Sequence, residues 1–446
     1  MGVTSSVLIE TVLASPTVQI GLAMFALVLV LCGWLLVMRR YVILLLWPVV
    51  IYFCGPVLTS VFASAPALGQ YIFASATLWE TLVIFLYFVG FIAVDIVFDV
   101  SSVIRASIHV PFVRQLAASP MFTVVFAAST ITAIALQCKL LLQFGTIFSG
   151  HYVYWADEGQ APVSYWGFLA GLYEIIFLCV VLLLLSNYRG TAKLLYLAIY
   201  AATAVLRVIG GTRLVLVKEI AFIVMLLYLE GKIKWRRLVA AAAVLVFSGT
   251  VVGLMRSSEA TGGFLGPLYG VAMESALNAL SFNIAYEAYL HGGMSVVTQA
   301  AHALAYSAAN AIPSFLRFGF DKADMNAIDP YVAGLTAGVD SVSPVGGMSG
   351  FATLVYVVGN PFLGVALLVP TLGMLLRWTP GSRLKHIAVL VFCLNAIHFW
   401  RDGLDISVKL IVQDVLCALL FLYIPAVRAE TSDLPSYERF TPHASR

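Results

Sequence analysis

The sequence predicts an all-helical protein that crosses a membrane about eleven times. Hydrophobic residues make up 61% of the 446 positions, and charged residues only 11%. The apolar residues occur in runs of about twenty, the length of a helix that spans the hydrocarbon core of a bilayer. Basic residues collect in every second gap between these runs, as they do in the cytoplasmic loops of polytopic proteins. These observations predict an all-α polytopic integral membrane protein.

The apolar runs and the gaps between them define four regions. Residues 1–255 are expected to hold spans one to eight, 256–350 a large extracytoplasmic loop, 351–427 spans nine to eleven, and 428–446 a cytoplasmic tail. The predicted spans cover about residues 18–38, 41–63, 77–98, 121–147, 165–186, 193–210, 213–230, 238–255, 352–377, 385–400 and 405–427. An odd number of spans places the termini on opposite sides of the membrane.

The basic residues orient the predicted spans. Of the 25 Lys and Arg, 16 lie in the tail or in alternate loops, which we expect to be cytoplasmic. The N-terminus is then expected on the outer side of the membrane. The other nine lie toward the outer face, where the insertion rule does not explain them and an anionic ligand would. They are Lys139, Arg207, Arg213, Lys218, Arg256, Arg317, Lys322, Arg401 and Lys409.

Several site classes have no support in the sequence. The six cysteines all lie inside apolar runs without a CxxC pair, so neither a disulfide framework nor a zinc site is indicated. No nucleotide-binding glycine motif or metal-ligand spacing is present. We therefore expect no cofactor, no metal and no nucleic-acid partner, and the lipid bilayer as the main surroundings.

The first candidate site is the segment GGTRLVLVKEI, which begins at Gly210. Thr212 is a plausible N-cap, so Arg213 is expected at the positive end of a helix on the outer face. Free backbone N–H groups and a guanidinium suit a phosphate or diphosphate. The alternative is that Arg213 reaches lipid headgroups, while Lys218 and Glu219 pair with neighbouring helices.

The second candidate site is HFWRDGLDISVKLIVQD, from His398 to Asp414. Arg401, Asp405 and Lys409 are spaced i, i+4 and i+8, so they form one helical stripe. Arg401 beside Asp402 is the stronger candidate for ligand contact, and Asp405 with Lys409 fits a self-neutralised structural stripe equally well.

The long outer loop adds further candidates, and the spans contain isolated acids. Arg256 ends span eight, and Arg317 follows a proline in IPSFLRFGFDK within a loop expected to combine surface helices with an irregular cover. The acids Glu80, Asp95 and Glu174 lie in predicted spans, where each is expected to pair with a basic or hydroxyl group. The histidines show no ligand spacing.

The order of four short motifs resembles a known family. GGTR at the start of a span, IPSFLRFG and VDSVSPVGG in a long outer loop, and RDGLD before the last span are similar to the Wzy-type oligosaccharide repeat-unit polymerases, which include the common antigen polymerases. The resemblance covers roughly residues 205–415. The chain departs from it at TAGVD, Thr336–Asp340, where the common antigen relatives resemble HSG.

The resemblance implies a GT-C-like membrane glycosyltransferase that polymerises undecaprenyl-diphosphate-linked repeat units into a surface polysaccharide. Arg213 and Arg401 match the family's arginines and are the predicted catalytic pair, because the leaving diphosphate needs positive charge. Donor and acceptor would both be lipid-linked oligosaccharides. A chain-length regulator and a flippase of the same pathway are possible partners.

The acceptor hydroxyl also needs a group to take its proton. Glu274, Glu287 and Asp340 of the outer loop are candidates, and Glu274 is the favoured one. Binding of the diphosphate or the glycan is assigned to Lys218, Arg256, Arg317, Asp340, Asp402 and Lys409. An O-antigen ligase acting on lipid A core and a lipid-linked glycan flippase or transporter remain the alternative functions.

Overall fold

A computed structural model of the chain shows a helical protein. It describes residues 15–53, 55–56, 74–144, 163–186, 191–210, 216–256, 275, 279, 281–283, 285–286, 349–378, 383–401 and 403–424. Every regular element within these ranges is a helix, and none of the described residues lies in a β-strand. The all-helical prediction is therefore confirmed for this part of the chain.

Six of the predicted spans are single helices. They are α2 (Pro16–Val37), α6 (Ala74–Phe98), α9 (Pro120–Phe144), α10 (Val163–Leu185), α11 (Thr191–Ile209) and α14 (Trp235–Arg256). Four stretches are long and apolar enough to cross a membrane, namely Pro16–Val37, Thr77–Phe98, Met121–Gln143 and Thr191–Ile209. The chain is thus a membrane-embedded helical protein.

The other predicted spans are interrupted. The region 41–63 begins with two single-turn helices, α3 (Ile43–Leu46) and α4 (Val49–Tyr52). The region 352–377 is divided between α19 (Gly350–Val358) and α20 (Pro361–Trp378). Gly359 has a φ of 75°, which favours glycine, and the following Pro361 starts the next helix. Hydropathy does not report such breaks, because the residues around them remain apolar.

Two further spans contain irregular helix. A π-helix, η4 (Leu216–Ile220), leads into α13 (Ala221–Leu229), and a second one, η7 (Ala418–Tyr423), continues α23 (Gly403–Cys417). Before α23, the chain forms α21 (Arg383–Leu394) and α22 (Ala396–Arg401). π-Turns of this kind often occur at functional sites, and η4 carries Lys218 and Glu219.

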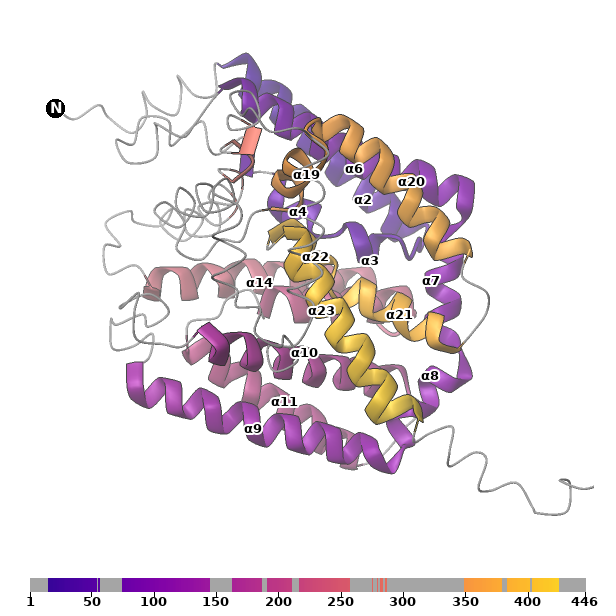
Figure 1. Cartoon of the computed structure of the whole chain (residues 1–446), viewed down its shortest axis with the longest axis vertical. Helices are drawn as coiled ribbons and strands as arrows, with labels where there is room; N and C mark the ends of the chain where they lie inside the picture. The colour runs from indigo at the N-terminus through magenta and orange to yellow at the C-terminus, as the bar shows by residue number, and fades with distance from the viewer. Residues whose placement is uncertain are drawn as a thin grey trace, which may run out of the picture.

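The helices differ in how deeply they are buried. Helix α2 exposes large apolar side chains such as Leu27, Val30 and Val37, which suits contact with lipid. Helix α10 is buried along almost its whole described length, and from Ile176 to Leu183 every side chain is at most 1% exposed. Figure 1 shows α10 between α9 and α23, which identifies α10 as a central helix.

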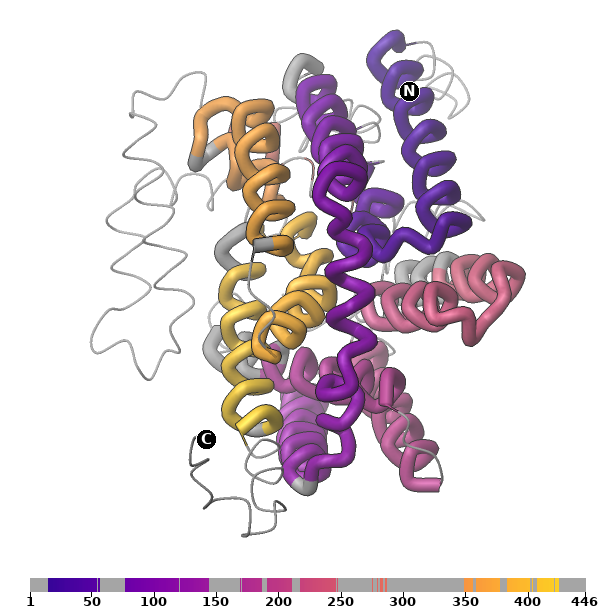
Figure 2. Tube along the Cα trace, turned by 90° about the vertical axis from the view of Figure 1, so that its right-hand side faces the viewer, coloured from indigo at the N-terminus to yellow at the C-terminus, as the bar shows by residue number. Residues whose placement is uncertain are grey.

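Several basic loops meet on one face. Figure 1 shows α7 (Val100–His109) and α8 (Pro111–Gln115) at the right-hand edge, across the ends of the long helices, and Figure 2 looks onto that edge. Arg40 Nε lies 2.8 Å from Asp95 Oδ2, and Tyr41 donates a hydrogen bond to Glu230. These contacts connect the loop after α2 with the end of α6 and the end of α13, beside loops that the basic residues assign to one side of the membrane.

Candidate functional site

The candidate site is a set of charged side chains buried where several helices meet. Its starting point is η4, in which two consecutive residues, Lys218 and Glu219, are 2% and 1% exposed. Adjacent residues of a helical turn point in different directions, so the two side chains reach different neighbours. Lys218 contacts α10 and α22, and Glu219 contacts α11.

Glu219 forms an ion pair with Arg207 at the end of α11. The Nη1 atom of Arg207 lies 2.6 Å from Glu219 Oε1, and Tyr200 donates a hydrogen bond to the other carboxylate oxygen. The guanidinium also lies 3.9 Å from the ring centroid of Tyr173, a cation–π contact. The Tyr173 hydroxyl in turn donates to Gln137 of α9. This ion pair therefore connects four helical elements.

Lys218 forms the second ion pair. Its Nζ atom lies 2.5 Å from Glu174 Oε2 on α10 and 2.8 Å from His398 Nε2 on α22. The same Nε2 atom is 3.4 Å from Glu174 Oε1. All three side chains are at most 10% exposed. Charges removed from water in this way are tolerated when they are paired and hydrogen-bonded.

A buried acid and an amide lie next to this second pair. Asn395 Nδ2 donates to Asp414 Oδ2 at 2.9 Å and to the Val391 carbonyl at 3.1 Å. Asp414 on α23 is an electrostatic neighbour of Glu174, Lys218 and His398. The remaining side-chain oxygens, Oδ1 of Asn395 and Oδ1 of Asp414, have no hydrogen-bond partner in the described part of the chain.

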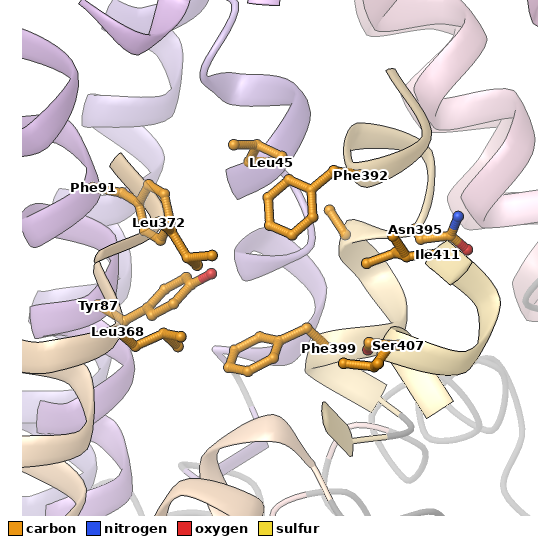
Figure 3. A pocket seen from close by; sticks show the side chains of 12 residues that line it. Leu45, Tyr87, Phe91, Leu368, Leu372, Phe392, Asn395, Phe399, Ser407 and Ile411 are labelled. Carbon is orange, nitrogen blue, oxygen red and sulfur yellow. The ribbon is translucent and has the colours of Figure 1, made fainter. Parts of the chain in front are cut away.

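A cavity of about 150 Å³ lies beside Asn395. Figure 3 shows the Tyr87 hydroxyl pointing into the space between Phe392 and Phe399. The other lining residues are Leu45, Phe91, Leu368, Leu372, Asn395, Ala396, Ser407, Val408 and Ile411. The walls are therefore mainly aliphatic and aromatic, and in Figure 3 the Tyr87 hydroxyl points into the space while the Asn395 amide is directed away from it.

Only part of the predicted site lies within the described residues. Arg213, Glu274, Glu287, Arg317, Lys322, Asp340 and Asp402 fall outside them, as do the side chains of Arg256 and Asp405. Arg401 is the last residue of α22 and is partly exposed, and Lys409 on α23 is also partly exposed. Lys218 is the one predicted binding residue whose described side chain is enclosed in an ion pair.

The contact between Lys218 and His398 brings the two predicted anion-binding segments together. Lys218 follows Arg213 by five residues, and His398 precedes Arg401 by three. In addition, Arg207 and Glu219, which flank Arg213 in the sequence, form an ion pair with each other. The sequence left open whether these segments converge, and the described residues that flank them do meet.

The buried acids have different partners. Glu174 pairs with Lys218, and Asp95 pairs with Arg40 and accepts hydrogen bonds from Ser101, as expected for acids in a membrane. Glu80 differs, because its Oε2 has no hydrogen-bond partner among the described residues.

Sequence reasoning gave His398 little weight and did not single out Asn395. Their only signal was a polar residue inside an apolar run.

The described residues contain no cluster of three or more His, Cys, Asp or Glu side chains placed to hold a metal ion. What they offer is buried ion pairs, an acid and amide with unpartnered oxygens, and an adjacent apolar cavity. Comparison of the chain with protein-family models, curated proteins and solved structures finds no match.

Proposed function

We propose that this protein is a GT-C-like membrane glycosyltransferase that polymerises undecaprenyl-diphosphate-linked oligosaccharide repeat units at the periplasmic face of the inner membrane. The growing chain would be transferred from its carrier to the outer end of a single repeat unit on a second carrier. Arg213 and Arg401 would stabilise negative charge on the leaving diphosphate. A loop carboxylate, with Glu274 favoured, would accept the proton of the attacking hydroxyl.

The observation that carries this proposal is the contact between Lys218 and His398. It joins the chain segments that contain the two predicted catalytic arginines, and their Nζ and Nε2 atoms are 2.8 Å apart. Two guanidinium groups can serve one diphosphate only when their segments lie close together. The Arg207–Glu219 pair supports the same proposal, because it anchors both ends of the Arg213 stretch and so favours a preorganised site.

The direct test uses the purified protein with lipid-diphosphate-linked repeat units as donor and acceptor. The unsubstituted protein is expected to produce a ladder of longer glycans without added divalent cation or nucleotide sugar. Arg213→Ala and Arg401→Ala should abolish the ladder, and Arg213→Lys should remain impaired, because an ammonium does not replace a bidentate guanidinium. Arg236→Ala is a matched control, because Arg236 is exposed in the first turn of α14, at the membrane face opposite to the one assigned to the site.

The outcomes separate the candidate functions. Normal ladders from Arg213→Ala would refute the diphosphate site, and a strict requirement for a divalent cation would refute the arginine mechanism. Transfer of glycan to lipid A core without dimers of the repeat unit would identify a ligase instead.

A transporter is the second candidate, and a specific feature favours it. The interrupted elements α3, α4 and η4, together with ionised groups inside the bundle, are typical of proteins that move a substrate across the membrane. A transporter would move lipid-linked glycan between the leaflets of reconstituted vesicles without lengthening it. The polymerase should lengthen it without that movement.

A further inference from the structure

We propose that Asp414 and its buried neighbours form a proton-exchange site inside the membrane. In this site Asp414 binds and releases one proton, while Glu174 and Lys218 remain an ion pair. The proposal does not depend on the polymerase function, because it rests on the charges and contacts of described residues alone. Any membrane process that takes up or delivers a proton could use such a group.

Among the residues that the structure describes, the charges around Asp414 require one further proton. With both carboxylates ionised, Lys218 charged and His398 neutral, the four side chains carry a net charge of −1, and one proton brings the cluster to neutrality. An unbalanced charge in a low-dielectric interior is strongly disfavoured. The neutral cluster is therefore the favoured one, and it holds one proton in addition to those of the charged Lys218 ammonium.

The hydrogen bonds indicate where this proton resides. His398 Nε2 lies 2.8 Å from the Lys218 ammonium, so this nitrogen accepts a hydrogen bond and carries no proton of its own. Glu174 already accepts from Lys218 at 2.5 Å. Asp414 has no basic partner within hydrogen-bonding distance among the described residues, and only the neutral Asn395 amide donates to it. The proton therefore belongs on Asp414.

Two unpartnered oxygens make exchange at this position feasible. Asp414 is 1% exposed, and its Oδ1 lacks a partner among the described residues, as does the Oδ1 of Asn395. Buried acceptors without a donor are uncommon, and a proton on Asp414 or a water molecule next to it would provide one. Asn395 also lines the cavity of Figure 3, with its amide directed away from the cavity and toward Asp414.

Several described elements around Asp414 contribute groups that tune this site. Helix α10 places Glu174 and Cys179 near it, η4 places Lys218, α22 places His398, and α23 itself places Cys417. Asn395, between α21 and α22, supplies the direct hydrogen bond. The two thiols are neutral, so the balance depends on the other four ionisable groups.

Infrared difference spectroscopy on the whole protein in lipid nanodiscs tests the proposal, because a protonated carboxylic acid has a carbonyl band well separated from that of a carboxylate. The measurement is made in a Glu80→Gln background, because Glu80 is a second buried acid with an unpartnered oxygen. In that background we expect such a band at neutral pH, its loss in alkali, and its absence when Asp414→Asn is added. Asp95→Asn is the matched control and should retain the band, because Asp95 is paired with Arg40. Lys218→Met should roughly double the band, since Glu174 then also takes a proton.

Three outcomes would overturn the proposal: no carboxylic acid band, a band that survives Asp414→Asn, or a band that does not respond to pH. Should Asp414→Asn fail to fold, Asn395→Leu provides an independent variant. It removes the amide donor to Asp414, so the band should shift to higher frequency. An unchanged frequency would exclude Asp414 as the proton carrier, whatever the protein does in a polymerisation assay.

Discussion

The molecule holds two groups of ion pairs in very different surroundings. In the interior, Lys218 pairs with Glu174, and the two side chains are only 3% and 7% exposed. At the face formed by α7 and α8, Arg40 pairs with Asp95, and the Arg40 side chain is 30% exposed. Loss of a partner leaves Arg40 with access to water, whereas Lys218 has none. The interior pair is therefore costly to keep, and its presence indicates a function beyond stability.

The face cluster has a structural role. Glu230, at the end of α13, accepts a hydrogen bond from Tyr41 and lies 3.2 Å from His109 Nε2 and 3.9 Å from Arg114 Nη2. It thus connects the loop after α2 with α7 and α8. Such contacts at helix ends fix the order of the helices, and they involve residues that basic-loop statistics already assign to one side.

The largest expected effect comes from breaking the interior pair. Glu174→Met should destabilise the protein by about 3–5 kcal/mol, because it leaves the buried Lys218 ammonium without its hydrogen-bonded carboxylate. The double variant Glu174→Met with Lys218→Met should recover most of this loss, since two apolar side chains of similar size replace the pair. Thermal unfolding in detergent measures both. A double variant as unstable as the single one would show that the pair itself contributes the stability.

A smaller effect is expected at the face. Asp95→Asn removes the charge opposite Arg40 and keeps a side chain that can accept a hydrogen bond from the Ser101 backbone. The loss should be about 1–2 kcal/mol, because Arg40 remains partly hydrated. The same unfolding assay ranks this variant against Glu174→Met. An equal or larger loss at Asp95 would remove the distinction between the two regions.

The smallest expected effect is a pH dependence at the same face. Burial lowers the pKa of His109, Glu230 opposes this shift, and Arg114 adds to it. The folded protein therefore binds fewer protons than the unfolded chain below the ordinary histidine pKa of about 6.5. The contribution of His109 is complete above that pH and is lost as the pH falls through the lowered pKa.

Replacement of His109 tests this dependence directly. His109→Asn should flatten the unfolding temperature between mildly acidic and neutral pH, because the neutral amide does not titrate. An unsubstituted protein that becomes more stable on acidification would contradict the expected sign. It would show instead that the protonated imidazole gains more from Glu230 than it loses by burial.

Much of the helical structure was predictable from local sequence. The helices α2, α6, α9, α10, α11 and α14 match predicted spans to within a few residues. Between α6 and α9, where no span was predicted, the chain forms the short helices α7 and α8, and Ser101, Ile104 and Ile108 on one face of α7 are buried. The breaks at Gly359 and in the region 41–63 were not predicted from hydropathy, although Gly359 and Pro361 form a local helix stop and start signal.

The candidate site was predictable only in part. Arg213 and Arg401 attracted attention because a charge in an apolar run is rare, and both remain predictions. Lys218 was expected to bind ligand or to pair with a neighbouring helix, and the structure shows the pairing with Glu174. His398 and Asn395 carried little signal alone, since one polar residue in a span does not reveal its neighbour.

The sequence by itself determined that this protein is helical and embedded in a membrane, because the length and polarity of an apolar run are local properties that set its preference for lipid. Only the tertiary structure decided which charged groups meet. Lys218 lies 44 residues from Glu174 and 180 from His398 along the chain. Such contacts depend on how α10, η4 and α22 pack, and packing is a property of the whole bundle rather than of any one helix.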